Sequence, residues 1–503
     1  RKCLKQNMSK TSTFQRHRSF LVLLSIVTAV RLFFAVYLRL VDDEAYYWEG
    51  GQHLDWSYLD HPPMTGWIGW LFSSIFGHNE FGVRLGPILI AALFLVLIYQ
   101  FTRRLYGDDR IAFRAALLFS IIPLFSIGSF MLLPDAPLSL FWLLSLIIFY
   151  RIVESGNGNL WFALGVVWGL GMLSKYNMLA LIGCVGLFLV LSAKHRFWLL
   201  RMKTWLGFLL GLLIFSPVIF WNIQRGFPSF RYHLVERNQG FQFTWEPVQI
   251  FLAGQLGYLS PLAFLAALVV LYQLGKMVFK EKDEKALFLL TMAVPYLLVF
   301  SIAVALSPTG KPHWPAMGYT TLFCALPWFW DKKWRTGGWW TKILHPAPVI
   351  VLSSAITLLI LTQSIYPIMK MEPHLDVTNE LYGWPEAGRQ IQVEYDRLSK
   401  EKATVVFTRR LNMAAPVCFY TPNHIPAYSI TAVNEQYDIW GRGTLASIPR
   451  GANGIYVADS RYTPGNVKQY GFKRAEALPP IEVIRAGKVV RRFFLFRLYD
   501  YQG

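Results

Sequence analysis

Two acidic side chains, Asp43 and Asp135, stand beside long apolar segments and could take part in acid–base chemistry. Asp43 lies in DDEAYYW, where its carboxylate could accept a proton from an attacking hydroxyl group. A solvated loop acid or a helix N-cap is the alternative interpretation. Asp135 lies in LPDAPL, and an Asp followed two positions later by Pro is a typical helix start, so capping and catalysis both stay open.

Several cations are placed to bind an anionic lipid group. Lys175 lies at a tight hairpin in LSKYN, where its ammonium group could meet a lipid phosphate, and snorkelling to the membrane interface is the alternative. The segment RGFPSFRYHLVER supplies Arg231 and Arg237 among aromatic residues, which suits a phosphate, a pyrophosphate or an acidic sugar, or else a solvated basic loop. Lys311, in GKPHWPA, is a further candidate for contact with the lipid phosphate.

Aromatic and histidine side chains in the same regions suit a sugar. Trp48 and Tyr58 could stack on a sugar face, although aromatic residues at a membrane interface need no such role. Together with Asp60 and His61, in LDHPPMTGW, they form the expected sugar or acceptor site. His61 and His313 are candidate metal ligands, but two histidines of unknown separation do not define a metal site. No cofactor is assigned, and a divalent metal ion stays open.

The composition indicates that membrane helices position these groups. The chain has 503 residues, of which 54% are hydrophobic and only 16% are charged, a balance too apolar for a soluble globular protein. Because a membrane-spanning helix needs roughly 20 apolar residues, we expect about eleven spans. Their approximate ranges are 19–41, 84–102, 111–132, 136–153, 160–174, 176–193, 205–221, 248–275, 286–306, 313–330 and 344–366.

The distribution of basic residues predicts the orientation in the membrane. Residues 1–18 are basic and precede a span that is too long for a signal-peptide core, so we expect a cytoplasmic N-terminus and a retained anchor. Lys and Arg residues then concentrate in alternate loops on that same side, as the positive-inside rule requires. These loops account for most of the net charge of +19, so nucleic-acid binding is not needed to explain it.

This orientation places two larger segments on the outer side of the membrane. The loop 42–83 contains no Lys or Arg, is rich in acids, and includes an apolar stretch, 64–77, that suits a helix lying in the interface. The final segment, 367–503, has globular composition and follows the transmembrane domain, 19–366. It predicts an α/β domain with a helix over 384–398 and strands over 403–408, 454–458 and 489–499.

Taken in order, DDEAYYW, LDHPPMTGW, LPDAPL, LSKYN and GKPHWPA resemble the bacterial members of the protein O-mannosyltransferase superfamily, which includes the aminoarabinose and galacturonic-acid transferases acting on lipid A. The resemblance covers residues 20–330 and implies the C-type glycosyltransferase fold. It implies that Asp43 is the catalytic carboxylate, with Glu44 beside it. It also matches the second acidic residue to Asp135 and the lipid-phosphate ligand to Lys175. Asp60 and His61 stand where the relatives carry a Glu-Lys pair.

The implied activity is inverting transfer of a sugar from a polyprenyl phosphate to an acceptor at the outer face of the inner membrane. The acceptor could be lipid A, another glycan or a protein. A lipid transporter or flippase is the alternative, but it would place ionisable residues near the bilayer midplane in repeated, broken helices. Most of them lie instead at the outer ends of the predicted spans, which favours the enzyme.

Overall fold

The computed structural model describes the chain except for residues 1, 236–243, 308, 333–338, 432–434 and 463. The chain divides into two compact units, and each contains segments that are distant in the sequence. The first, called here the helical unit, comprises Arg1–Phe33, His61–Thr65 and Leu85–Leu359. The second, the sheet unit, comprises Phe34–Asp60, Gly66–Arg84 and Ile360–Gly503.

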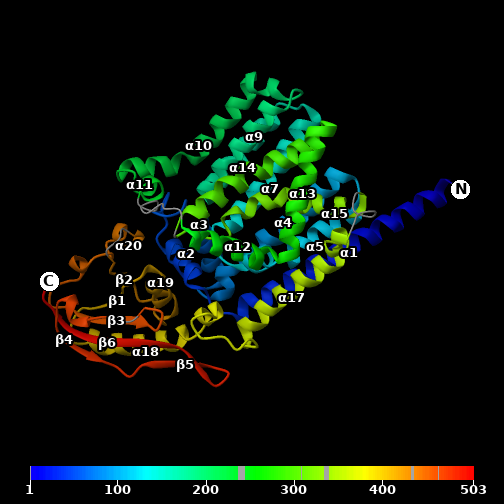
Figure 1. Cartoon of the computed structure of the whole chain (residues 1–503). Helices are drawn as coiled ribbons and strands as arrows, with labels where there is room; N and C mark the ends of the chain where they lie inside the picture. The colour runs from blue at the N-terminus through cyan, green and yellow to red at the C-terminus, as the bar shows by residue number, and fades with distance from the viewer. Residues whose placement is uncertain (1, 236–243, 308, 333–338, 432–434, 463) are drawn as a thin grey trace. The chain divides into compact units, whose positions relative to one another are not determined.

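Long apolar helices build the helical unit (Figure 1). Within the described residues, seven helices are long and apolar enough to cross a membrane, and a bent pair makes eight. The seven are His17–Tyr37 in α1, α4 (Glu80–Tyr106), α7 (Asp135–Ser155), α10 (Met202–Gln224), Pro261–Glu281, α14 (Glu284–Leu306) and α17 (Pro346–Ile365). Shorter helices include α8 (Leu160–Ser174), α9 (Leu179–Leu191), α12 (Trp245–Leu259) and α15 (Tyr319–Lys332). The chain is therefore a multi-pass membrane protein.

Two of the predicted spans are interrupted directly before a proline. The predicted span 111–132 consists of α5 (Asp109–Ile121) and a short helical stretch, Pro123–Phe130, which is bent by 76° from α5. The predicted span 248–275 consists of α12 and α13 (Pro261–Lys276), separated by Ser260 at φ 67°. A residue before proline is disfavoured in the α conformation, because its backbone clashes with the proline ring. Both breaks have this physical cause.

Glycines allow α8 and α10 to approach each other closely. A Cβ atom at Gly165 would lie 2.0 Å from the carbonyl oxygen of Gly207, and one at Gly169 would lie 2.7 Å from the carbonyl oxygen of Gly211. Within each helix the two glycines are four residues apart and share one face. Small residues at this spacing let membrane helices gain van der Waals contact over their backbones.

A six-stranded mixed sheet forms the core of the sheet unit. Five strands follow the order β2 (Ala427–Ser429), β1 (Thr404–Thr408), β3 (Asn453–Asp459), β6 (Lys488–Tyr501) and β4 (Phe472–Ala477), while β5 (Ile481–Arg485) also pairs with β6. The first three are parallel, and β6 runs antiparallel to β3 with Tyr456 opposite Phe496. Every residue of β3 is buried, as expected of a central strand. The strands predicted at 403–408, 454–458 and 489–499 correspond to β1, β3 and β6.

Four helices of the sheet unit are relevant to the position of the candidate site. α18 (Trp384–Ser399), predicted over 384–398, packs on the sheet and on α19 (Leu411–Tyr420), and α19 in turn packs against α2 (Asp42–Gln52). The segment after α2 forms α3 (Met64–Phe76), which approaches α2 so closely that a Cβ atom at Gly51 would lie 2.7 Å from the oxygen of Gly66. The acidic segment that begins α2 therefore folds together with the C-terminal part of the chain.

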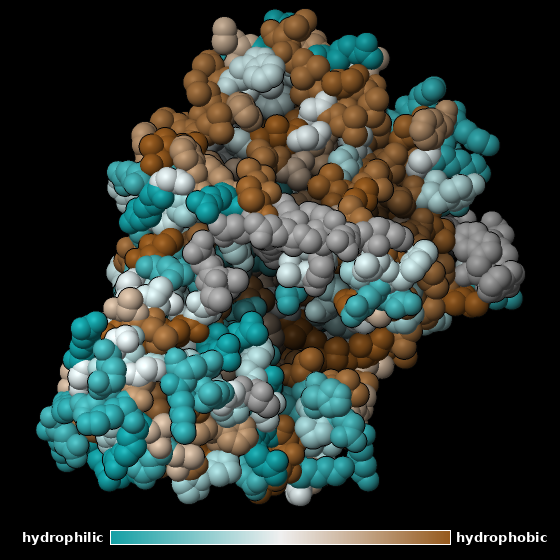
Figure 2. All heavy atoms as spheres, turned by 60° about the vertical axis from the view of Figure 1, so that its left-hand side comes forward, coloured by the Kyte–Doolittle hydropathy of each residue, from teal (hydrophilic) through white to brown (hydrophobic). Residues whose placement is uncertain are grey.

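The surfaces of the two units differ in chemistry. Figure 2 shows predominantly apolar residues over the helical unit and predominantly polar residues over the sheet unit. This contrast fits a unit that sits in lipid and a unit that is solvated.

Candidate active site

Three consecutive acids, Asp42, Asp43 and Glu44, form the first turn of α2. Val41 before them is extended, and its backbone N–H donates to Oε2 of Glu44 at 3.1 Å. Acidic side chains are favoured here because the first turn of a helix carries unpaired N–H groups and the positive end of the helix dipole. The DDE sequence is therefore a helix start, but the three carboxylates have very different surroundings.

Glu44 is fully buried in an ion pair with Arg84. Nε of Arg84 lies 2.8 Å from Oε1, and Nη2 lies 2.5 Å from Oε2, so the guanidinium group binds both carboxylate oxygens. Both side chains are 0% exposed. Arg84 also donates to the backbone oxygens of Leu38 and Arg39. Through Arg84, Glu44 therefore connects the first turn of α2 to Leu38 and Arg39, which precede that helix.

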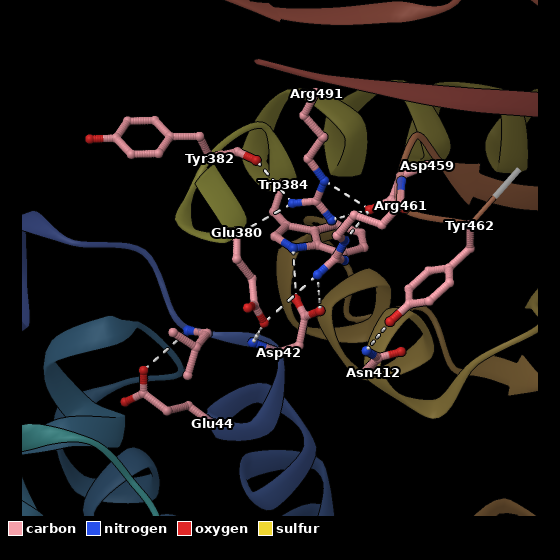
Figure 3. A network of polar contacts seen from close by, with 11 residues as sticks. Asp42, Glu44, Glu380, Tyr382, Trp384, Asn412, Asp459, Arg461, Tyr462 and Arg491 are labelled. Carbon is pink, nitrogen blue, oxygen red and sulfur yellow. Dashed lines mark hydrogen bonds and ion pairs between the residues drawn. The ribbon is translucent and has the colours of Figure 1, made fainter. Parts of the chain in front are cut away.

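Asp42 is also buried and ion-paired, on the side of the C-terminal segment (Figure 3). Its Oδ2 accepts a hydrogen bond from Nη1 of Arg461 at 2.8 Å, and its Oδ1 accepts one from Nε1 of Trp384 at 3.2 Å. Its backbone N–H donates to Oε1 of Glu380 at 3.1 Å. Arg461 in turn binds Asp459 through Nε at 2.8 Å.

Asp43, between these two anchored acids, has an exposed side chain. Successive helical residues point about 100° apart, so the contacts that draw Asp42 and Glu44 inward leave Asp43 facing outward. An exposed carboxylate on a helix turn fixed from both sides is well suited to accept a proton from a bound acceptor.

In the helical unit, Lys175 and Asp135 form an ion pair. Nζ of Lys175 lies 2.9 and 2.7 Å from the two carboxylate oxygens of Asp135. The Lys175 side chain is only 7% exposed and that of Asp135 is 31% exposed. Lys175 therefore does not extend into the interface as a snorkelling side chain would. Its partner Asp135 occupies the first turn of α7, so the predicted helix start is confirmed.

Other predicted residues gather near this pair. The ring of Tyr176, next to Lys175, lies 5.2 Å from that of His233, and the His61 ring lies 6.5 Å from His233. His313 is within electrostatic range of Asp135. The backbone before His313 is held by Gln255, whose Nε2 donates to the oxygen of Pro312 at 2.6 Å.

The residues predicted to bind the sugar or acceptor in the sheet unit have internal partners. Trp48 is 1% exposed, and its Nε1 donates to Nδ1 of His78 at 3.1 Å. The Tyr58 hydroxyl donates to the oxygen of Gly50 at 2.6 Å, and Asp60 accepts from the Tyr46 hydroxyl at 2.8 Å. Trp48 and Tyr58 therefore help to pack α2, whereas Asp60, which is half-buried, keeps access to a ligand.

A second carboxyl group, Glu435, lies within electrostatic range of Asp60. Burial is the main reason that its pKa is raised to about 7, and the nearby Asp438 and Asp60 carboxylates raise it further, while Ser429 and Arg410 oppose the shift. The Ser429 hydroxyl donates to Oε2 of Glu435 at 2.8 Å. This group can therefore exchange a proton near neutral pH.

The remaining predicted ligands are less defined. Arg231 and Lys311 are exposed, and Arg237 lies outside the described residues. Within the part of the chain that the structure describes, no three His, Cys, Asp or Glu side chains gather as metal ligands.

The sequence interpretation missed Arg84 and Arg461, which anchor the two acids beside Asp43. Arg84 stands in an apolar helix, and an arginine in such a place normally has a buried acidic partner, so this signal was available. Arg461 is one of many basic residues in a solvated segment, and nothing in its sequence surroundings distinguishes it.

Comparisons with known proteins show which sequences this chain is similar to. Residues 60–221 match the family model described as dolichyl-phosphate-mannose-protein mannosyltransferase. The lipid A galacturonosyltransferase RgtD of Rhizobium johnstonii is 23% identical over 390 residues, which cover 75% of this chain and 77% of the relative. An undecaprenyl phosphate-alpha-4-amino-4-deoxy-L-arabinose arabinosyl transferase of Erwinia tasmaniensis is 26% identical over 282 residues, and the match covers 52% of this chain and 48% of that relative.

Solved structures share the fold. The crystal structure of ArnT from Cupriavidus metallidurans bound to undecaprenyl phosphate has a TM-score of 0.65 at 16% identity, covering 96% of this chain and 99% of that one. The Archaeoglobus fulgidus oligosaccharyltransferase tethered with an acceptor peptide has a TM-score of 0.52 at 12% identity, covering 87% of this chain and 69% of that one. The family model, these relatives and the shared fold together support the glycosyltransferase superfamily of the protein mannosyltransferases and the lipid A aminoarabinose and galacturonic-acid transferases, and the chain has the C-type glycosyltransferase fold.

Proposed function

We propose that this enzyme transfers a sugar from a polyprenyl-phosphate donor to lipid A or a related glycan, with inversion at the anomeric carbon. The exposed Asp43 carboxylate, held between two buried and ion-paired acids, is the observation that carries the proposal. The relatives named as lipid A and aminoarabinose transferases support the donor and acceptor classes.

In the proposed reaction, Asp43 takes the proton from the acceptor hydroxyl group as that oxygen attacks the anomeric carbon. The bond from this carbon to the phosphate oxygen breaks, and polyprenyl phosphate leaves with the electron pair. Asp42 and Glu44 act by positioning, because both carboxylates are already occupied by arginines.

The phosphate of the donor lipid is assigned to cations of the helical unit. Lys175 has three N–H donors, and its pairing with Asp135 orients its ammonium group. It can therefore donate to the leaving phosphate as negative charge develops there. Arg231 and Lys311 are exposed and remain the proposed further phosphate contacts. Asp60 and His61 remain the proposed contacts to the sugar or acceptor.

We further propose that the N-terminus is cytoplasmic and that the sheet unit lies outside the inner membrane. The basic residues of 1–18 and the loop 276–285 support this orientation through the positive-inside rule. A polyprenyl-phosphate donor is delivered by the membrane itself, so the reaction needs no soluble nucleotide sugar on the outer side.

The test of the reaction is transfer of radiolabelled sugar from synthetic polyprenyl-phosphate sugars by purified enzyme in detergent. Asp43→Asn keeps the size of the side chain but cannot take up the proton, so we expect turnover to fall by about 100- to 10,000-fold. The variant should unfold at the parent temperature, because Asp43 is exposed.

Asp396→Asn is the matched control, since Asp396 is also an exposed helical aspartate of the sheet unit. It should transfer sugar at the parent rate. Parent turnover by Asp43→Asn would remove Asp43 from the mechanism, and lipid scrambling without transfer by the parent would instead favour a flippase.

A further inference from the structure

We propose that Arg461 is a positioning residue for the reaction: it holds Asp43 in place by fixing the first turn of α2 through Asp42. The inference rests on the proposed role of Asp43. It assigns a function in catalysis to the C-terminal segment, from which Arg461 comes.

Arg461 connects α2 to the centre of the sheet through two different nitrogen atoms. Its Nη1 binds Oδ2 of Asp42 at 2.8 Å, and its Nε binds Oδ2 of Asp459 at 2.8 Å. Asp459 is the last residue of β3 and is 0% exposed. Because the guanidinium group is planar and rigid, the two bonds fix the direction of the Asp42 carboxylate relative to β3.

A second arginine also binds Asp459, the partner of Arg461 in β3. Arg491, in β6, binds Oδ2 of Asp459 through Nε at 2.8 Å and Nη2 at 2.5 Å. Its Nη1 also donates to the backbone oxygens of Glu380 and Tyr382, and its guanidinium carbon lies 4.7 Å from the centre of the Trp384 ring (Figure 3). Trp384 is itself a donor to Asp42. The anchor of α2 is therefore a network with buried members and not a single surface ion pair.

This network affects Asp43 because it holds the first turn of α2, in which Asp43 lies. The first turn of a helix lacks intrahelical hydrogen bonds for its N–H groups and frays readily. The backbone N–H of Asp42 is satisfied by Glu380, and its side chain by Arg461 and Trp384. Asp43 is the next residue, so rotation or fraying of this turn would move its carboxylate directly. A displacement of about 1 Å in a reacting group can lower turnover by about 100-fold.

The experiment measures kcat, the donor KM and the unfolding temperature for Arg461→Met, Asp42→Asn and Arg492→Met. Asp42→Asn keeps the acceptor for Trp384 but loses the charge that binds Arg461. Arg492→Met is the matched control, because Arg492 forms an exposed ion pair with Glu482 on the same sheet. We expect kcat to fall about 10- to 100-fold in the first two variants, with the donor KM within about twofold of the parent and the control unchanged.

A double-mutant cycle separates positioning from stability. If Arg461 acts through Asp43, then Arg461→Met combined with Asp43→Asn should be no slower than Asp43→Asn alone. Arg461→Lys should not restore kcat, because one ammonium group cannot reproduce the planar fork to Asp42 and Asp459.

Three results would overturn the inference. Parent kcat in both Arg461→Met and Asp42→Asn would show that the anchor is dispensable. Multiplied losses in the double variant, or a loss confined to the unfolding temperature, would show that Arg461 acts independently of Asp43. Parent turnover by Asp43→Asn is a different failure, since it rejects the proposed function, and Arg461 would then have no catalytic carboxylate to position.

Discussion

Burial changes the acid–base behaviour of Glu435, which lies within electrostatic range of Asp60 in the sheet unit. The pKa of Glu435 is raised to about 7, mainly by burial, whereas an unfolded chain holds a glutamate near 4.3. Between these two pKa values, Glu435 is therefore protonated in the folded protein and ionised in the unfolded chain. Stability from this group is fully present below the unfolded pKa and is lost as the pH rises toward 7 and through it.

We therefore predict that Glu435→Gln flattens the fall in unfolding temperature between about pH 4.5 and 7.5. Each pKa unit corresponds to about 1.4 kcal/mol, so the difference from the parent should be measurable by scanning calorimetry or fluorescence. Glu401→Gln serves as the control, because Glu401 is exposed. Identical pH profiles for the parent and Glu435→Gln would show that Glu435 titrates as an ordinary surface acid.

Sequence reasoning offered a helix N-cap as the alternative for Asp43, and the DDE acids do form the first turn of α2, but the sequence could not separate their surroundings. Asp42 and Asp43 have the same side chain and adjacent positions, and Asp42 is distinguished by its bonds to Arg461 and Trp384, which lie far along the chain. The assignment of Asp43 came from the family resemblance. Lys175 and Asp135 were both named, but their pairing requires the contact between the start of α7 and the end of α8.

At the level of the helices, the close contact between α8 and α10 depends on glycines, which have no side chain. Gly165→Val places atoms where the Gly207 backbone now lies, so the two helices must separate. We expect a loss of about 2–4 kcal/mol of stability, in the upper range for overpacked sites, with lower yield of folded enzyme in detergent.

Gly183→Val, in α9, is the matched control for this prediction, because a Cβ atom at Gly183 meets nothing within 4 Å. It should unfold at a temperature close to that of the parent. Equal unfolding temperatures for Gly165→Val and Gly183→Val would contradict the close-packing interpretation.

The sequence predicted about eleven spans, whereas seven helices of the described residues, or eight with the bent pair, are long and apolar enough to cross a membrane. Long apolar stretches predict such helices because lipid imposes length and composition on each one. The predictions were less reliable where proline breaks a helix within an apolar run, as before Pro123 and Pro261. The strands of the C-terminal segment were recognisable from β-branched and aromatic residues, but their order was not. Strand order follows from contacts such as that of β1 with β3, across about 50 residues of chain.

For the whole molecule, the proposed orientation predicts which surfaces a membrane-impermeant reagent can reach in intact cells. A cysteine introduced as Glu401→Cys, at an exposed position of the sheet unit, should react with an impermeant maleimide. Lys280→Cys, at an exposed position in the predicted inner loop, should react only after the membrane is permeabilised. Cys3 should be replaced in both variants, and the reverse pattern would invert the proposed topology.

The buried acids of α2 also set the order in which the enzyme can be completed during synthesis. Asp42 lies 419 residues before Arg461. Glu49 is a further buried acid of α2, and it lies 393 residues before its own partner, Arg442. At a translation rate of about 5–20 residues per second, a ribosome needs roughly 20 to 80 s to make that intervening chain. A nascent chain already inserted in the membrane therefore holds these carboxylates without their partners and cannot yet fix Asp43. Only a polypeptide whose C-terminal part has emerged can assemble the turn that carries Asp43, so under the proposed mechanism incomplete chains would not consume lipid-linked sugar.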